Sequence, residues 1–247
     1  MDVQTLITPE YVFKKSLSRQ GDRRLKKEAR ILSLTASSPH TPQLRSMRSK
    51  PDGLCLQTEY ISGQSAKDWL CINEQWHGKA IPWKEAKTRL KQYVEAEIDL
   101  LSRGIMYRDL NPEHILFSDK KAVLIDHESG LRRAEDMQSW VLDDIRGTWE
   151  TMAPEEFLAR GIIFSEIATY RVAVFSYLVL TGELPFLRKS TRKETHKWRI
   201  GHPPIISQRL PYTVRKIFGA ALARSPSCRH SEPSRFFDSL CQTLDSI

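Results

Sequence analysis

Two aspartates stand in a setting that suits catalysis. Asp109 lies in the segment YRDLNPEHILF, in a turn after a predicted helix, and Asp126 ends the apolar run of VLIDHESG. A predicted hairpin between the two residues would bring both carboxylates together at the ends of rigid elements. In such a pair, one carboxylate can orient a hydroxyl nucleophile while the other holds Mg²⁺.

The elements that would position this pair follow from hydrophobic periodicity. Residues 82–102 predict a long helix that ends at Gly104, because apolar residues recur there at spacings of three and four. That apolar stripe consists of Ala86, Leu90, Val94, Ile98 and Leu101. Two short apolar runs, 114–117 and 122–125, predict the hairpin, and the apolar stretch 172–180 predicts a buried helix.

A smaller unit rich in strands precedes the long helix. Three apolar runs predict strands, at residues 3–7, 11–13 and 54–60. Residues 23–34 predict a basic helix, and residues 33–51, which are polar and contain prolines, predict a loop for most of their length. The predicted boundary between this unit and the helical remainder falls at residues 60–63.

Composition excludes several classes of protein. The chain has 247 residues, of which 40% are hydrophobic and 28% charged, a balance typical of a soluble globular protein. Its four cysteines form no Cys-x-x-Cys pair, which argues against a disulfide framework or a zinc site and favours a reducing compartment. Because no apolar run is long enough to span a membrane and no basic leader segment is present, we expect a cytoplasmic protein.

Several motifs resemble those of the protein-kinase superfamily and occur in the same order. YRDLNPEH resembles the family's HRDLKPEN, and Asp-His-Glu at 126–128 stands where the family has Asp-Phe-Gly. Residues 147–157 (GTWETMAPEEF) resemble the end of an activation segment. Two later elements of the family are resembled by residues 180–186 (LTGELPF) and 221–231 (ALARSPSCRHS). Residues 11–14 (YVFK) resemble the strand that carries the family's VAIK lysine. Residues 25–32 (LKKEARIL) resemble the helix that carries the glutamate partner of that lysine.

The resemblance covers nearly the whole chain and is strongest to bacterial or eukaryotic-like Ser/Thr kinases. It implies an α+β, bilobal protein-kinase-like fold that forms one domain. A truncated, small β-rich N-lobe would span residues 1–61, and a mainly helical C-lobe would span residues 62–247. The implied activity is transfer of a phosphoryl group from ATP, with Mg²⁺, to the hydroxyl of a protein substrate.

The resemblance also implies roles for single residues. Asp109 would accept the proton of the substrate hydroxyl, with Asn111 beside it in the catalytic loop and Thr148 positioning that loop. Asp126 and His114 occupy the two metal-ligand positions. The implied ATP-binding residues are Lys14, Glu28, Thr58, Glu59, Ile61 and Leu116. Late in the chain, Arg229 would form a structural ion pair with Glu155.

The family's Gly-rich loop has no counterpart in this sequence. Only thirteen residues precede Lys14, and none of them is glycine. Because the backbone N–H groups of that loop normally cover the phosphates, we expect weaker ATP binding or a partner that covers the site. A start site placed too late, or truncation of the gene, is an alternative explanation.

Other departures fall on residues near the expected chemistry. Asn111 replaces the catalytic-loop lysine, and His114 replaces the asparagine that ligates Mg²⁺, although imidazole is a poor ligand for that ion. His127 and Glu128 replace the phenylalanine and glycine that follow the metal-binding aspartate. Ala168 stands where the family has an aspartate that anchors the catalytic loop.

Three hypotheses stay open on these grounds. The first is a Ser/Thr protein kinase with a degraded active site, and the second is a pseudokinase that acts as a binding or regulatory scaffold. A small-molecule or glycan kinase is less favoured, because the activation segment ends in Ala-Pro-Glu at 153–155, a platform that normally holds a peptide. A transition-metal pair of His114 and His127 is disfavoured, because no cysteine or third histidine lies nearby.

The net charge of +8 favours anionic partners. The basic residues gather in two clusters, which are either solvated helix faces or a docking surface for an acidic protein partner. The first cluster contains Lys14, Lys15, Arg19, Arg23, Arg24, Lys26, Lys27 and Arg30. The second contains Arg188, Lys189, Arg192, Lys193, Lys197 and Arg199. No nucleic-acid-binding motif is present, so we expect no nucleic acid partner.

Overall fold

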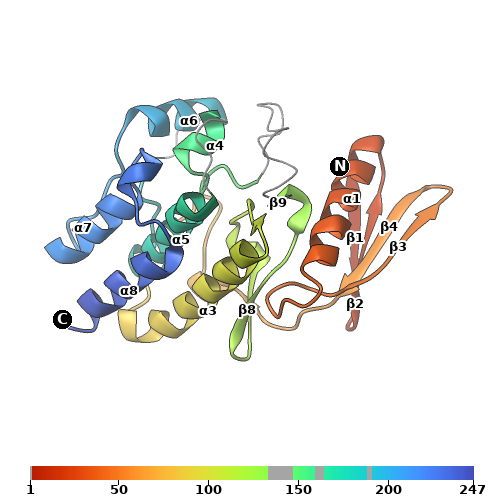
Figure 1. Cartoon of the computed structure of the whole chain (residues 1–247), viewed down its shortest axis with the longest axis horizontal. Coiled ribbons are helices and arrows are strands. Elements are labelled where there is room, and N and C mark those ends of the chain that lie inside the picture. The colour runs from red at the N-terminus through yellow and green to blue at the C-terminus, as the bar shows by residue number, and fades with distance from the viewer. Residues whose placement is uncertain (1, 133–146, 159–163, 188–190) are drawn as a thin grey trace.

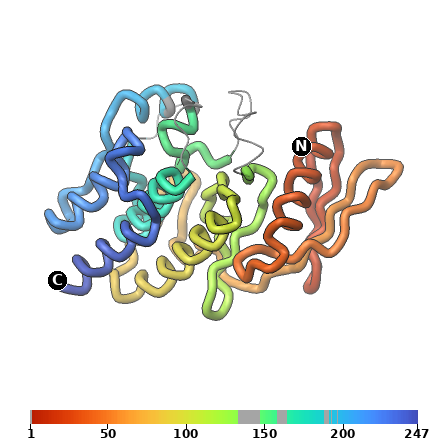
Figure 2. The backbone as a smooth tube through the Cα atoms, in the orientation of Figure 1, coloured from red at the N-terminus to blue at the C-terminus, as the bar shows by residue number. Residues whose placement is uncertain are grey.

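The chain folds into a small sheet-and-helix part and a larger helical part (Figure 1). The structure, a computed structural model, describes residues 2–132, 147–158, 164–187 and 191–247. Figure 2 shows that the N-terminal residues lie apart from the C-terminal helices, with the hairpin after the long helix between them. No helix in the described ranges is both long enough and apolar enough to cross a membrane.

The N-terminal part is a four-stranded antiparallel sheet with one helix packed on it. The sheet has the order β1-β2-β4-β3. Its elements are β1 (Val3–Ile7), β2 (Tyr11–Ser16), α1 (Arg19–Leu34), β3 (Leu44–Lys50) and β4 (Gly53–Glu59). Side chains of β4 alternate between buried and half-buried, and its Leu54 and Leu56 pack against Leu25 and Ala29 of α1. This apolar layer holds α1 against the sheet.

Two of the sequence predictions for this part need correction. The predicted loop at residues 33–51 contains strand β3, whose side chains are mostly polar and exposed because it lies at the edge of the sheet. Such a strand has no apolar alternation for the sequence to reveal. Helix α1 starts at Arg19 rather than at residue 23, because Ser18 caps it by accepting a hydrogen bond from the Gly21 N–H at 3.0 Å. The other strands are confirmed.

The connection from the sheet leads to a short strand and helix, then to the long helix and the hairpin. These elements are β5 (Gln64–Ser65), α2 (Ala66–Leu70), α3 (Trp83–Ser102), β6 (Ile105–Met106), η1 (Pro112–His114), β7 (Ile115–Ser118), β8 (Lys121–Leu124), η2 (His127–Ser129) and β9 (Leu131–Arg132). The predicted helix and hairpin are both confirmed. Ile98, predicted on the buried stripe, is 37% exposed, because α3 packs between β8 and the helices α5 and α8 and buries two faces instead of one.

The remaining helices pack around α5, which is buried on nearly every side as its apolar sequence predicts. They are α4 (Pro154–Leu158), α5 (Phe164–Thr181), α6 (Arg192–Gly201), α7 (Tyr212–Ala221), η4 (Pro226–Cys228) and α8 (Pro233–Leu244). Tyr93 of α3 meets Phe175 of α5 with ring centroids 4.8 Å apart. The predicted ion pair is confirmed, since Arg229 donates to both carboxylate oxygens of Glu155, at 2.6 and 2.8 Å.

A buried carboxyl on α3 has an unusual environment. Glu97 is 1% exposed, and its Oε1 accepts a hydrogen bond from the Tyr93 hydroxyl at 2.6 Å. Burial raises the pKa of Glu97 from its ordinary value of 4.5 to about 7, although Tyr93 and Arg171 both favour the charged form. The contribution of Glu97 to stability should therefore be fully present below about pH 4.5 and be lost as pH rises through about 7.

We predict that Glu97→Gln removes this pH dependence of the free energy of unfolding. One pKa unit corresponds to about 1.4 kcal/mol, so ionisation of Glu97 costs the native chain about 3 kcal/mol at about pH 8. Glutamine keeps an oxygen for the Tyr93 hydroxyl but cannot ionise. Urea unfolding at about pH 5 and about pH 8 measures the difference. The matched control is Glu95→Gln on the exposed side of α3, and equal pH dependence in both variants would contradict the prediction.

Candidate active site

The first candidate carboxylate, Asp109, lies in the loop between β6 and η1 and is mostly buried. Its Oδ1 accepts a hydrogen bond from the Thr148 hydroxyl at 2.5 Å, and its Oδ2 lies 3.1 Å from His114 Nδ1. Burial alone would raise the pKa of Asp109, but the contacts with His114 and Thr148 outweigh it and hold the pKa below its ordinary value. Asp109 is therefore an ionised carboxylate, with acceptor oxygens only.

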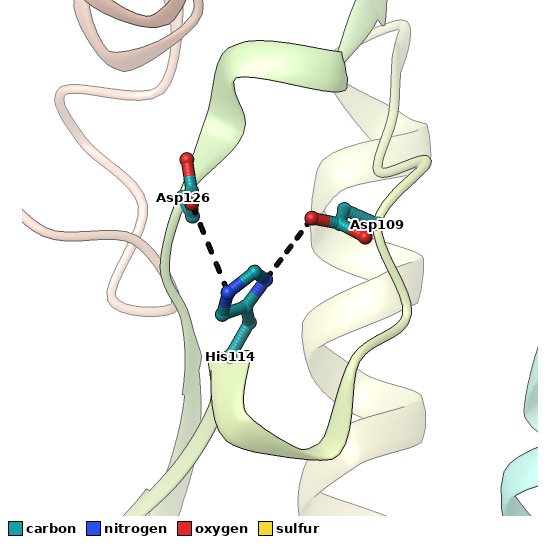
Figure 3. Close-up of side chains that lie close together, drawn as sticks. All are labelled: Asp109, His114 and Asp126. Atoms are coloured by element: carbon teal, nitrogen blue, oxygen red, sulfur yellow. Dashed lines mark ion pairs between the residues drawn. The ribbon is translucent and has the colours of Figure 1, made fainter. Parts of the chain in front are cut away.

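The second carboxylate, Asp126, follows β8 and has a left-handed backbone conformation with φ of 61°. Its Oδ1 lies 3.0 Å from Lys14 Nζ, and its Oδ2 lies 3.7 Å from His114 Nε2. Figure 3 shows the imidazole of His114 between the two aspartates. Burial would raise the pKa of Asp126, but Lys14 and His114 outweigh it and lower that pKa. The hairpin predicted from the sequence thus brings both carboxylates to one site.

Lys14 joins the sheet, the helix and the site. Its Nζ, on β2, lies 2.8 Å and 2.9 Å from the two carboxylate oxygens of Glu28 on α1, and 3.0 Å from Asp126. Burial alone would lower the pKa of Lys14, but the negative charges of Glu28 and Asp126 outweigh it and raise that pKa. The lysine is therefore a fixed positive charge beside Asp126.

A second ion pair joins α1 to the site. Glu128, in η2, accepts a hydrogen bond from Arg24 Nε at 2.8 Å and a second one from Arg24 Nη2. The family has glycine in the place of Glu128, so this contact depends on a departure from the pattern. The sequence gives no sign of the pairing, because Arg24 reads as one basic residue among several on the helix.

His127 does not join the candidate metal ligands. Its Nε2 lies 2.8 Å from the Leu124 carbonyl, so Nε2 carries the hydrogen, and its ring centroid lies 5.3 Å from that of Tyr107. Burial lowers the pKa of His127 to about 4, which keeps the ring neutral. Within the described ranges, Asp109, His114 and Asp126 instead form the group whose possible ligand atoms lie within 4.8 Å of one another.

Buried charged side chains of α4 and α5 hold the start of the catalytic loop, at residues 107 and 108. Arg171 of α5 donates hydrogen bonds to the Tyr107 carbonyl and to Glu156 Oε1, and Arg108 Nε lies 3.7 Å from the same Glu156 oxygen. Ala168 does replace the family's anchoring aspartate, but Arg171 holds the loop from the same helix. A charged residue inside an otherwise apolar helix was the signal that could have revealed it.

The end of the activation segment lies directly on this loop. Gly147 has φ of +107°, and a Cβ there would lie 2.4 Å from the Arg108 carbonyl oxygen, so only glycine fits without strain. This close approach brings Thr148 to Asp109. Thr151 secures the contact by donating a hydrogen bond to the Leu110 carbonyl at 2.8 Å.

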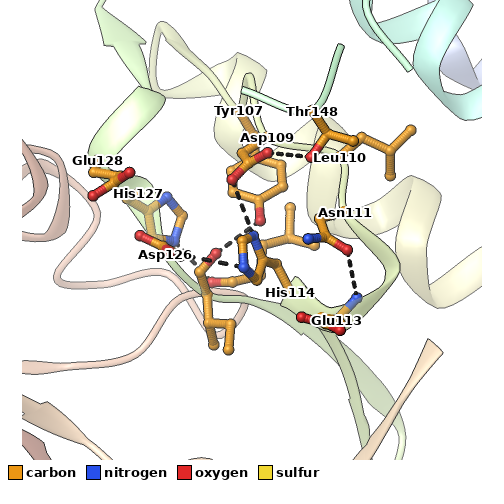
Figure 4. Close-up of polar contacts among 12 residues, drawn as sticks. Tyr107, Asp109, Leu110, Asn111, Glu113, His114, Asp126, His127, Glu128 and Thr148 are labelled. Carbon is orange, nitrogen blue, oxygen red and sulfur yellow. Dashed lines mark hydrogen bonds and ion pairs between the residues drawn. The ribbon is translucent and has the colours of Figure 1, made fainter. Parts of the chain in front are cut away.

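The remaining predicted residues lie outside this cluster. Asn111 caps η1 by accepting a hydrogen bond from the Glu113 N–H at 3.0 Å, as Figure 4 shows. The predicted ATP contacts are placed on β4 (Thr58 and Glu59), on the connection after it (Ile61) and on β7 (Leu116).

The donor atoms fit a divalent cation, but they fit Mg²⁺ only in part. Asp126 offers a carboxylate oxygen, which Mg²⁺ prefers. His114 offers an imidazole nitrogen, which suits Mn²⁺, Co²⁺ or Zn²⁺ better than Mg²⁺. The chemistry that the cluster supports is therefore cation-assisted transfer near a fixed positive charge, with Asp109 available to orient a hydroxyl group.

Comparison with known proteins agrees with this geometry. The family model described as "Protein kinase domain" matches residues 7–242. Serine/threonine-protein kinase pkn2 of Myxococcus xanthus is 30% identical over 169 residues, which cover 66% of this chain and 19% of that protein. Serine/threonine-protein kinase D of Synechocystis sp. is 27% identical over 229 residues, which cover 89% of this chain and 42% of that protein.

The chain thus spans well under two thirds of the length of these relatives. The family match, in contrast, extends over both the sheet part and the helical part and includes every residue of the site cluster. Its motifs, its α+β architecture and its relatives all agree with the predicted resemblance. This chain belongs to the protein kinase domain family and is a serine/threonine kinase-like protein.

Proposed function

We propose that this chain transfers a phosphoryl group from ATP to serine or threonine hydroxyls of proteins, with the help of a divalent cation. The observation that carries the proposal is the position of Lys14 Nζ, which lies 2.8 Å from Glu28 and 3.0 Å from Asp126. A lysine held in this way presents a positive charge where the phosphates of a nucleotide would approach Asp126. The N-lobe of this unit would span residues 1–61 and the C-lobe residues 62–247.

Each charged side chain of the cluster has a separate task in this proposal. Ionised Asp109 accepts the hydrogen bond of the substrate hydroxyl and then its proton. Lys14 would neutralise charge on the phosphates, and Asp126 would hold a divalent cation that supplies further positive charge beside them. Thr148 fixes Asp109, so the hydroxyl meets a carboxylate that is already oriented. Thr58, Glu59, Ile61 and Leu116 would receive the rest of the nucleotide.

A pseudokinase is the second candidate, favoured by one observation. His114 lies 3.1 Å from Asp109 Oδ2, so the imidazole competes with a substrate hydroxyl for that oxygen. In a binding protein without catalysis this contact would simply neutralise a buried carboxylate. The two candidates differ in whether phosphoryl transfer depends on the Asp109 carboxylate.

The proposed acidic character of the partner has less support in the structure than in the sequence. Lys14 and Arg24 of the first basic cluster are engaged with Glu28, Asp126 and Glu128. Arg199 of the second cluster is 3% exposed and donates to the carbonyl of Trp149. Arg188 and Lys189 lie outside the described residues. Lys15 of the first cluster also pairs with Asp52, and Lys27 and Arg30 make further interactions, so an acidic protein would compete with partners within the chain.

We predict that Asp109→Asn lowers the rate of phosphoryl transfer strongly without unfolding the chain. An amide keeps the shape of the side chain but cannot take the proton, and loss of a general base typically costs about 10²- to 10⁴-fold in rate. The measurement is incorporation of labelled phosphate from ATP into generic protein substrates, with Mg²⁺ and with Mn²⁺. Asp119→Asn, on the exposed turn between β7 and β8, is the matched control. Equal incorporation by both variants would refute Asp109 as the base, and no incorporation by the native chain would favour the pseudokinase.

Glu128 should help to hold Lys14 and Glu28 in register with the site, because its partner Arg24 lies on the same helix as Glu28. We predict that Glu128→Gln increases backbone amide hydrogen exchange in α1 and weakens nucleotide binding about 3- to 10-fold, as expected for loss of about 1 kcal/mol from a partly exposed ion pair.

Glu113→Gln is the control for this variant, because it removes an exposed ion pair with Lys67 on the surface of the helical part. The doubly exchanged variant Arg24→Glu with Glu128→Arg should recover part of the affinity. Unchanged exchange in α1 after Glu128→Gln would show that the ion pair does not position the helix.

A further inference from the structure

We propose that His114 makes the cation site select a first-row transition cation, such as Mn²⁺, over Mg²⁺. In this proposal His114 Nε2 and Asp126 Oδ2 are the ligands, and Asp109 orients the imidazole without touching the ion. The proposal deepens the function proposed above and rests on it, because the nucleotide phosphates would complete the coordination of the ion.

The two ligand atoms already have nearly the right separation. His114 Nε2 and Asp126 Oδ2 lie 3.7 Å apart, which is too far for a good hydrogen bond. Two ligands that each lie about 2.1 Å from one cation are separated by about 3 to 3.6 Å, depending on the angle at the ion. A cation between these atoms therefore requires a movement of only a few tenths of an ångström.

The other ring nitrogen of His114 fixes which atom can bind. Nδ1 lies 3.1 Å from Oδ2 of Asp109. Burial would lower the pKa of His114, but Asp109 and Asp126 outweigh it and raise that pKa, so without a cation the ring favours its protonated form. A cation at Nε2 would replace the proton on that atom and leave the hydrogen on Nδ1, toward Asp109. A carboxylate that accepts from the second nitrogen of a metal-binding histidine is the usual arrangement in metal sites. Asp109 lies close enough to be such an outer partner, and a small rotation of the ring would align the Nδ1–H with Oδ2.

The backbone and the neighbouring charges leave these atoms available. The His114 N–H donates to the Asn111 carbonyl at 2.8 Å, and the His114 carbonyl accepts from Ile125 N–H at 3.0 Å, so the backbone is held on both sides. Asp126 divides its two oxygens, since Oδ1 faces Lys14 and Oδ2 faces His114. A cation at Oδ2 does not displace the lysine.

The selectivity follows from the chemistry of the donors. Mg²⁺ requires near-octahedral oxygen ligands and loses its waters reluctantly, so an imidazole adds little to its binding. Imidazole nitrogen binds the first-row transition cations, with affinity that is lowest for Mn²⁺, rises to Cu²⁺ and is lower again for Zn²⁺. Mn²⁺ also accepts carboxylate, phosphate and water oxygens, which would make up the rest of this site.

The test measures cation binding directly, so it does not depend on catalysis. The full chain is titrated with Mn²⁺ and monitored by electron paramagnetic resonance, with and without a non-hydrolysable ATP analogue, and bound Mn²⁺ is then displaced with Mg²⁺. We expect at least about a tenfold preference for Mn²⁺ in the native chain. Electron spin-echo modulation should show coupling between Mn²⁺ and a ¹⁴N nucleus.

Two variants assign the nitrogen to its residue. His114→Asn offers an oxygen in the same place, so we expect the ¹⁴N coupling to disappear and the preference for Mn²⁺ to fall to about twofold or less. His77→Asn, in an exposed loop after α2, is the matched control and should keep both properties. Asp109→Asn should weaken Mn²⁺ binding about 10- to 100-fold although Asp109 does not touch the ion. Thermal unfolding confirms that each variant is folded, and His114→Gln replaces any His114→Asn chain that is not.

Absence of ¹⁴N coupling in the native chain, or an unchanged ratio of Mn²⁺ to Mg²⁺ affinity in His114→Asn, would overturn the proposal. The outcome is separable from that of the proposed function. Nitrogen-coupled Mn²⁺ without phosphoryl transfer would reject the kinase activity and keep the site. Phosphoryl transfer supported equally by Mg²⁺ and Mn²⁺, without nitrogen coupling, would keep the activity and reject the role of His114.

Discussion

The buried ammonium group of Lys14 is the constraint on which the arrangement of this molecule depends. Its two partners come from different places, Glu28 from the helix on the sheet and Asp126 from the end of the hairpin. Removing three charges from water is costly, and the cost is offset only while each charge keeps its partner. The sheet, the helix and the hairpin are therefore held to one mutual position by electrostatics, and Arg24 with Glu128 adds a second bond across the same boundary.

The helical part uses the same principle beneath the catalytic loop. Arg171 and Arg108 are almost completely buried and share Glu156, so one carboxylate partly offsets two buried positive charges. Arg171 also holds the Tyr107 carbonyl, and this places Asp109 two residues further along. A positive side chain that binds a carbonyl thus does the work that the family assigns to a negative side chain in this helix. The loop is still held by this helix, although the side chain that holds it is positive instead of negative.

Patterns that report burial were enough to predict most of the fold. The apolar stripe of α3, the hairpin and the all-apolar α5 were all recognisable, because each depends on local periodicity. The edge strand β3 was missed because its side chains face water. The motifs identified Lys14, Glu28, Asp109 and Asp126 as one site, but not the pairing of Arg24 with Glu128 or of Arg171 with Tyr107. Those contacts join segments that lie far apart in the chain. They could not be predicted from periodicity, because a single polar residue forms no repeating pattern.

The role of His114 decides whether the departures from the family pattern remove the active-site chemistry or alter it. An ionised carboxylate has about four lone-pair sites, and Asp109 gives one to Thr148 and one to His114. Two sites remain, so a substrate hydroxyl has to compete with the imidazole at Oδ2 but can still reach the Asp109 carboxylate. A cation on the opposite nitrogen would leave the contact with Asp109 intact, because Nδ1 and Nε2 point in different directions. Cation binding and hydroxyl orientation can therefore occur together around one histidine, which is an arrangement that asparagine, with a single short amide, does not offer.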